Sequence, residues 1–212
     1  MKKLLSLAAV LALSVSAFAA DALQIDSAHS SINFSVRHMM ISNVPGSITG
    51  ISGTVNYDDK DVAKSSIDAT IKVTTISTAN ENRDRDLRGP NFFDTDKFPE
   101  AKFVSKRIEK RGDNYVAIGD LTIKDVTKEI ELPFEISKGQ TPNGLAIGVS
   151  ASTTINRKDY HINYGRVMDN GGAVVSDNVK LEINLEAKPP RKDAPKTAPT
   201  DKKEEPKSET KK

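Results

Sequence analysis

From Leu23 to Ala187 the sequence alternates apolar and polar residues, segment after segment, with a period of two. This period places the apolar side chains on one face of a β-strand and the polar side chains on the other. About eight such segments, with no long helical pattern between them, predict an all-β fold: an extended antiparallel eight-stranded barrel closed around an apolar interior. Such a barrel either fills with its own side chains or holds one small ligand.

The predicted strands differ in regularity. The first begins at residues 23–25 and continues at 31–36, and the others lie at residues 46–57, 66–76, 101–105, 115–123, 129–136, 145–155 and 179–187. The segment 46–57 contains Gly50 and Gly53, which predict a bent or bulged strand. An immunoglobulin-like sandwich is the competing architecture, but the sequence has no Trp and no Cys pair to mark it.

Both ends of the chain are expected to lie outside the barrel domain of residues 20–187. Residues 1–19 predict a cleaved signal peptide, because two lysines precede a short apolar stretch that ends at Ala17-Phe18-Ala19. A signal peptide predicts a periplasmic protein, with secretion as the alternative. Residues 188–212 contain five prolines and no aromatic or branched aliphatic residue, so we expect a disordered tail.

The charge of the chain is divided along the same boundaries. The overall value is +2, whereas residues 20–187 carry 20 Lys/Arg and 24 Asp/Glu, a net charge of −4. An acidic domain argues against nucleic acid as a partner. The tail carries nine Lys/Arg and five Asp/Glu, so transient contact with a membrane surface is an alternative to a solvated spacer. The oligomeric state stays open, with a dimer among the alternatives.

The sequence offers little for covalent or acid–base chemistry. It has no Cys and no nucleophile elbow, zinc-binding helix or phosphate-binding loop. His29, His38 and His161 have no ligand-like spacing. We therefore expect no enzyme activity, no catalytic residue, no metal site and no cofactor.

His38 and Arg37 follow a predicted strand. Counting by twos from Ile32 puts His38 on the inner face, at a cavity mouth or bonded to a loop, and puts Arg37 outside, where it would pair with Asp84 or Asp86.

The polar residues 80–88 precede Gly89-Pro90 and predict a short helical insertion. Arg83 and Asp84 belong to it, and the helix is either a polar lid or a solvated helix held by its own i,i+4 ion pairs. The four phenylalanines that follow either plug one barrel end or line a pocket entrance: Phe92, Phe93, Phe98 and Phe103.

Six short motifs occur in a fixed order. They are Ile25-Asp26-x-x-His29-Ser30, Phe34-Ser35-Val36-Arg37-His38, Arg83-Asp84-x-x-Leu87, Phe92-Phe93-Asp94 with Phe98-Pro99-x-Ala101-x-Phe103, Gly119-Asp120-Leu121-Thr122-Ile123, and Asn156-Arg157-Lys158-Asp159-Tyr160. In this order they resemble the YceI-like family of bacterial exported proteins over about residues 22–187. The tail lies outside the resemblance.

The resemblance implies a lipocalin-like barrel with an elongated cavity for a polyisoprenoid or another long-chain, fatty-acid-like amphiphile. It implies that cavity positions are Phe34, Val36, Ile71, Val73 and Phe103, and that positions near the mouth are Arg37, His38, Arg83 and Asp84. With Phe92 and Phe93, these are the candidate ligand-binding residues. The chain departs from the family at His161, where the family usually has Gly.

Three functions compete at this stage. The first is a periplasmic lipid carrier for transport, storage or sequestration. The second is an enzyme that acts on a barrel-bound lipid. Its candidate catalytic site is His38 beside Asp84 or Arg37, which is a weak indication. The third is a solid-barrel interaction or stress protein.

Overall fold

The computed structural model describes residues 21–165 and 174–190. The strands are β1 (Asp21–Ile25), β2 (Ser31–His38), β3 (Ser42–Ile48), β4 (Ile51–Tyr57), β5 (Ser66–Lys72), β6 (Glu100–Arg111), β7 (Asn114–Ile123), β8 (Val126–Thr141), β9 (Gly144–Asn156) and β10 (Val175–Lys188). The helix is α1 (Glu81–Arg88), and the 3-10 turns are η1 (Ser27–His29), η2 (Val62–Lys64), η3 (Val73–Thr75) and η4 (Arg157–Tyr160). None of the helices in these two ranges has the length and apolar character to span a bilayer.

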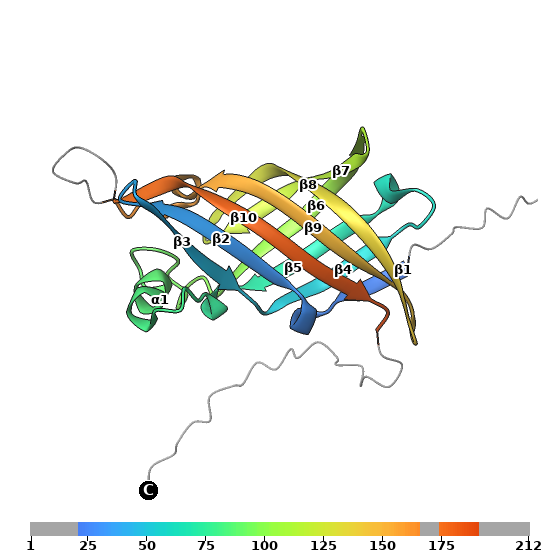
Figure 1. The fold of residues 1–212 in the computed structure, drawn as a ribbon, viewed down its shortest axis with the longest axis horizontal. Helices are drawn as coiled ribbons and strands as arrows, with labels where there is room; N and C mark the ends of the chain where they lie inside the picture. The colour runs from blue at the N-terminus through green and yellow to red at the C-terminus, as the bar shows by residue number, and fades with distance from the viewer. Residues whose placement is uncertain (1–20, 166–173, 191–212) are drawn as a thin grey trace, which may run out of the picture.

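The strands form one antiparallel sheet that closes on itself (Figure 1). β10 pairs with β9 along one edge, and its other edge pairs first with β2 and then with β1. β1 and β2 therefore share one place in the barrel, as do β3 and β4, so ten strands make a closed barrel of eight. The predicted eight-stranded barrel with one short helix is confirmed.

The strand boundaries differ from the prediction in several places. The strand predicted at residues 66–76 ends at Lys72, where the turn η3 begins, and the strands predicted at 101–105 and 129–136 extend to Glu100–Arg111 and Val126–Thr141. The single bent strand predicted at residues 46–57 is two strands, because Gly50 has a φ of +71° between β3 and β4. A positive φ ends the pleat, and Gly adopts it without strain. β3 also begins at Ser42, before any apolar alternation appears, because its backbone pairs with β2.

The sequence predicts a signal peptide at one end of the chain and a disordered tail at the other. The signal peptide predicted at residues 1–19 lies outside the described residues, as does the tail beyond residue 190. β10 continues through Lys188, one residue past the predicted domain boundary.

Asp26 links the first strand of the barrel, β1, to the last strand, β10. Its carboxylate caps η1 by accepting from the Ala28 N–H at 3.1 Å, contacts His29 Nδ1 at 2.6 Å and pairs with Lys188. Its own N–H donates to the Glu186 carbonyl at 2.8 Å. The hydrogen bonds from Lys188 and His29 lower the pKa of Asp26 well below its usual value.

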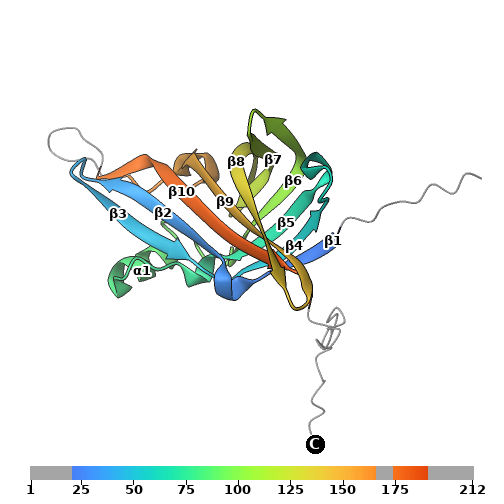
Figure 2. The ribbon, with the colours of Figure 1, turned by 45° about the vertical axis from the view of Figure 1, so that its right-hand side comes forward.

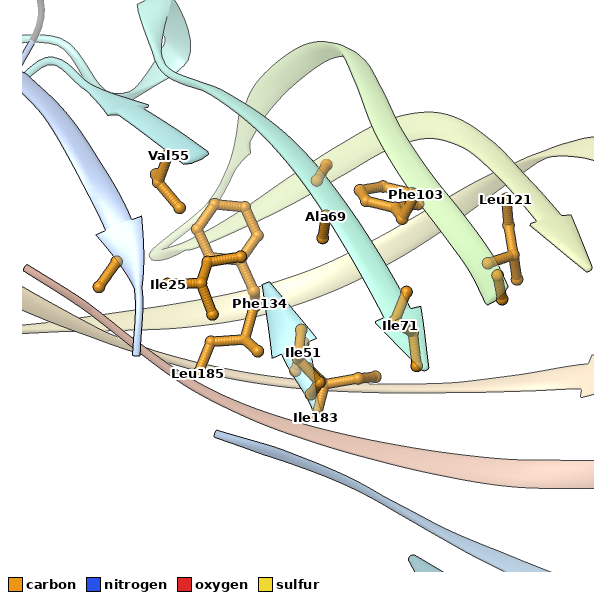
Figure 3. Packing of buried hydrophobic residues seen from close by; sticks show 14 of the residues in the cluster. Ile25, Ile51, Val55, Ala69, Ile71, Phe103, Leu121, Phe134, Ile183 and Leu185 are labelled. Atoms are coloured by element: carbon orange, nitrogen blue, oxygen red, sulfur yellow. The ribbon is translucent and has the colours of Figure 1, made fainter. Parts of the chain in front are cut away.

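The barrel is long (Figures 1 and 2), and a cluster of buried apolar side chains fills its middle (Figure 3). Figure 3 shows Ile51 beside Ile183, between Ile71 on one side and Phe134 on the other. Ile51 is 1% exposed and belongs to a continuous cluster of buried apolar side chains from nearly every strand. The apolar residues of the alternating sequence pattern are the side chains of these strands that point into the barrel.

We expect Asp26→Asn to lower the free energy of unfolding by about 1–2 kcal/mol, which is about 2–8 °C in Tm, because it weakens a cap and removes an ion pair. The pKa of Asp26 is lowered in the folded state, so its contribution is present above about pH 4 and disappears as the pH falls further. The difference between wild type and variant should therefore shrink in acid.

The control is Asp61→Asn, because Asp61 caps η2 through the Ala63 N–H but does not bridge to β10. Thermal unfolding monitored by circular dichroism from neutral to acidic pH measures both variants. An equal loss in the two variants would contradict the bridging role of Asp26.

Candidate functional site: an apolar chamber and its mouth

An apolar chamber lies inside one end of the barrel. It offers about 150 Å³ to the centres of water-sized molecules. Its walls come from β2, β3, β5, η3, the segment around α1, and the facing strands β6, β7, β9 and β10. The lining side chains include Phe34, Val36, Ile71, Val73, Leu87, Phe92, Phe93, Leu121, Ile155, Tyr160, Ile162, Val179 and Leu181.

The segment of residues 73–99, here named the covering segment, completes the wall of the chamber. Among the described residues the outer edge of β3 pairs with no other strand, and the covering segment lies between this edge and the start of β6. Ser77 and Ser47 exchange two backbone hydrogen bonds, at 2.8 and 2.9 Å. Val73 N–H donates to the Pro99 carbonyl at 2.9 Å and fastens the other end of the segment. An unpaired sheet edge is thereby capped by a piece of chain that also carries chamber side chains.

Asp84 fixes the position of α1 within the covering segment. Its buried carboxylate accepts hydrogen bonds from the backbone N–H and the hydroxyl of Thr78. Arg83 in turn donates through Nε to the Thr78 hydroxyl at 2.7 Å and through Nη2 to the Thr78 carbonyl at 2.9 Å. Burial raises the pKa of Asp84, but the hydrogen bonds from Thr78 and Ser77 and the charge of Arg88 outweigh it, so the net pKa lies below the usual value.

The chamber adjoins a wider, partly polar hollow, here named the mouth. The mouth offers about 720 Å³ and shares Phe34, Val36, Leu87, Phe92 and Val175 with the chamber. Its polar and charged lining residues are Thr78, His38, Arg83, Arg85, Asp86 and Asn91. Among the described residues the site is thus amphipathic, with an apolar interior and a mouth that has more basic than acidic groups.

A second, smaller cavity lies at the other end of the barrel, here named the far cavity. It offers about 50 Å³ and is lined by Val55, Tyr57, Phe103 and Phe134 among others. It shares no lining residue with the chamber. Ile51 and Ala69 are buried and line neither cavity, so a packed layer separates the two. In place of the single elongated cavity that the resemblance implied, the described residues enclose two.

The predicted site residues fall into three groups. The chamber is lined by Phe34, Val36, Ile71, Val73, Phe92 and Phe93, and the mouth by Phe34, Val36, Phe92, His38 and Arg83. Phe103 lines the far cavity instead of the chamber. Arg37 and Asp84 line neither the chamber nor the mouth.

Arg37 and Asp84 therefore have different neighbours from those expected. The Arg37 side chain points outward, as the count by twos predicts, but donates to the Met40 carbonyl at 3.0 Å and to Asn43 rather than to a carboxylate. The predicted pairing with Asp84 or Asp86 is wrong, because Asp84 is turned inward towards Thr78. Within the described residues neither Arg37 nor Asp84 hydrogen-bonds the imidazole of His38.

The ion pairs predicted along α1 are also absent from the described residues. Arg85 donates to Asn82, and Arg88 donates to the Ile76 carbonyl at 3.1 Å. Both arginines thus bond to uncharged oxygens, and Arg88 ties α1 to the chain that precedes it.

Arg157 is a chamber residue that the sequence analysis did not select. It is 5% exposed, and its guanidinium donates to the carbonyls of Ser176 and Ile162 and to the carboxylate of Asp177. These bonds satisfy the buried charge and fasten the start of β10 to η4. The sequence pattern could have identified Arg157, because the alternation that ends at Ile155 places residue 157 on the same inner face.

His161 occupies a position that suits glycine. It ends η4 with a φ of +55°, a conformation that side chains other than Gly, Asn, Asp and His rarely adopt. Its Nδ1 lies 3.1 Å from Asp125, and this hydrogen bond lowers the pKa of Asp125. The imidazole is exposed and lines neither the chamber nor the mouth.

Comparisons with known proteins agree on one family. The family model described as "YceI-like domain" matches residues 23–187. A UPF0312 protein of Staphylococcus aureus is 36% identical over 164 residues, which cover 76% of this chain and 94% of the relative.

Two solved structures are similar to the barrel. The YCEI protein of Campylobacter jejuni is 31% identical with a TM-score of 0.62, and the match covers 73% of this chain and 90% of the other. A polyisoprenoid binding domain from Saccharophagus degradans, implicated in plant cell wall breakdown, is 15% identical with a TM-score of 0.60. That match covers 81% of this chain and 99% of the domain, and at this identity it establishes a shared fold.

We expect Gly46→Ala to shrink the chamber. Gly46 lies opposite Phe34, and a Cβ at Gly46 would lie 2.1 Å from Phe34 Cζ, so the ring must move. Overpacking costs about 1–3 kcal/mol, so uptake of an apolar fluorophore should weaken roughly tenfold. Gly139→Ala is the control, because a Cβ there meets nothing within 4 Å. Adding Phe34→Leu to Gly46→Ala should restore uptake, and a failure to do so would contradict this placement of the ring.

We expect His161→Gly to raise the free energy of unfolding by up to about 1 kcal/mol, or about 2–4 °C in Tm, because glycine relieves the positive φ. The exposed contact with Asp125 offsets only part of this gain. His161→Ala is the matched variant, because it loses the imidazole and keeps the strained backbone. Differential scanning calorimetry should rank the Gly variant above the Ala variant, and the reverse order would be evidence against strain at this position.

Proposed function

The chain belongs to the YceI-like family, and on that basis we propose that it binds a long-chain amphiphile, either a polyisoprenoid or a fatty-acid-like lipid. The apolar chain lies in the chamber and the head group lies at the mouth. The observation that carries this proposal is a chamber lined almost entirely by apolar side chains, Arg157 being the charged exception, that adjoins a polar, basic mouth. The polyisoprenoid binding domain of Saccharophagus degradans, which shares the fold, supports the same ligand class.

The volume of the chamber bounds the length of the bound chain. A water-sized group needs about 10–15 Å³ of such volume, so 150 Å³ accommodates a chain of roughly ten to fifteen carbons. Burying about ten methylenes contributes about 8 kcal/mol, against association costs of roughly 4–15 kcal/mol. A short acid therefore binds weakly, and a long chain gains the most from the site.

Longer ligands reach beyond the chamber. The layer of Ile51 and Ala69 separates the chamber from the far cavity, which is itself lined by apolar side chains such as Phe103 and Phe134. A polyisoprenoid longer than about fifteen carbons either moves this layer and enters the far cavity or leaves its excess length at the mouth.

The head group meets His38, Arg83 and Arg85 at the mouth. Two guanidinium groups there favour an anionic or strongly polar head group. The mouth supplies orientation rather than an evident reaction, because the expected partners of His38 in an enzyme, Asp84 and Arg37, are engaged elsewhere. A carrier or sequestering protein is therefore favoured over an enzyme.

We propose the periplasm as the cellular place of this binding, on the pattern of residues 1–19. A signal peptide at residues 1–19 exports the chain to the periplasm, where it holds its lipid for transport, storage or sequestration.

Native mass spectrometry of protein purified without detergent tests the proposal. We expect a co-purified hydrophobic ligand, and Leu181→Trp should lose it because residue 181 lines the chamber. Lys180→Trp is the matched control, because the neighbouring side chain on β10 is exposed on the outside of the barrel. Wild-type protein that carries no lipid and takes up no fluorescent lipid would exclude the proposed function.

The same preparation separates binding from catalysis. A lipid recovered unchanged after long incubation with wild type and with His38→Ala indicates binding alone. Conversion of the lipid by wild type but not by His38→Ala would establish the enzyme instead.

A further inference from the structure

The turn between β2 and β3 carries most of the large apolar side chains that the described residues expose. Four such side chains are exposed: Met39, Met40, Ile41 and, on β6, Val104. The first three are consecutive, and Met40 and Ile41 are 66% and 77% exposed. Single exposed apolar residues are ordinary, whereas a cluster at one projecting turn calls for an explanation. Met39, Met40 and Ile41 are named the tip.

The backbone of the tip favours other residues than those present. Met39 and Met40 have φ values of +50° and +59°, and Ile41 N–H donates to the His38 carbonyl at 3.0 Å. A hairpin turn with two consecutive positive φ angles is most stable as Asn-Gly. Two methionines make this turn less stable than Asn-Gly would. The stability of the turn therefore does not explain their presence, and a function of their exposed side chains would.

One arginine contacts the backbone of the tip, and two more line the adjoining mouth. The guanidinium of Arg37 donates to the carbonyl of Met40, which places a positive charge directly beside the apolar side chains. Arg83 and Arg85 line the mouth. Within the described residues none of these three arginines pairs with a carboxylate, and Asp86 is the acidic residue that lines the mouth. An apolar projection with cations at its base matches the interface of an anionic bilayer, where apolar groups enter and arginines meet phosphates.

The tip and the mouth belong to the same end of the barrel. His38 and Val44, on either side of the tip, line the mouth. In both views the turn between β2 and β3 lies at the end that carries α1 (Figures 1 and 2).

We propose that the tip inserts into the surface of an anionic phospholipid membrane and thereby holds the mouth of the barrel against the bilayer. This inference deepens the proposed function and rests on it, since a mouth held at a bilayer gives a lipid a route that avoids water. The tip is the docking element, and Arg37, Arg83 and Arg85 supply the electrostatic attraction.

Vesicle co-sedimentation of the chain from Ala20 to Lys212 tests this inference. The vesicles contain equal parts of phosphatidylcholine and phosphatidylglycerol, or phosphatidylcholine alone. The test variant is Met40→Ser with Ile41→Ser, and the matched control is Val104→Ser, an exposed apolar residue on the barrel wall. All three proteins carry the same tail, so its basic residues cancel in the comparison.

We expect wild type and Val104→Ser to bind the anionic vesicles. The tip variant should bind roughly tenfold more weakly for each apolar side chain replaced. Neutral vesicles should weaken wild-type binding by about fivefold for each arginine that meets a phosphate, and added salt should weaken binding to the anionic vesicles.

The proposal is overturned if wild type does not bind anionic vesicles or if the tip variant binds as wild type does. It is also overturned if light scattering detects a dimer that the tip variant dissociates, because a second copy of the chain then covers the tip.

Uptake of a fluorescent lipid in solution distinguishes this inference from the proposed function. The tip variant should load lipid as wild type does, since the tip lines neither the chamber nor the mouth. If wild type loads no lipid but binds vesicles through the tip, the carrier function fails and membrane docking stands.

Discussion

The closure of the sheet by β10 is the constraint on which the rest of the structure depends. One edge of this strand pairs continuously with β9, and the other pairs with β2 and then with β1. Because every central strand then has two neighbours, backbone pairing is largely satisfied without a core thick enough to fill the whole interior. The barrel can therefore keep an apolar chamber at one end while its middle is packed.

The price of closing ten strands into eight places is a gap at the chamber end. Within the described residues β3 pairs with β2 and with no second strand, and the covering segment lies against its other edge. Asp84, Thr78 and Arg83 hydrogen-bond to one another within that segment and fix its shape, while Val73, Phe92 and Phe93 pack against the core. Residues that resemble a catalytic or ligand-binding cluster in the sequence thus stabilise a wall, while Phe92 and Phe93 from the same segment face the chamber.

The same gap explains why the two ends of the barrel differ. At the far end Asp26 and Lys188 seal the junction of β1 and β10, and large side chains leave little free volume. At the chamber end the hairpin of β2 and β3 bears the tip (Figure 1). An amphiphile and a bilayer both require an apolar surface next to a polar one, and this end provides both within a few residues of β2.

The sequence by itself determined the repeating units. The period of two predicted which side chains share one face of a strand. The resemblance to the family added the prediction that Phe34, Val36, Ile71 and Val73 face a cavity, and the chamber includes them. It also determined the helix, since Asn80 caps it and Gly89 ends it. These features depend on local stereochemistry, which neighbouring residues specify.

Only the tertiary structure decided how the strands combine. The pairing of Asp26 with Lys188, the burial of Arg157 and the partners of Arg37 and Asp84 join residues that no local pattern relates. Whether the interior is one tunnel or two cavities depends on how Ile51 and Ala69 meet side chains from distant strands. Packing of this kind depends on the volumes of many side chains at once, and a periodic pattern carries only their direction.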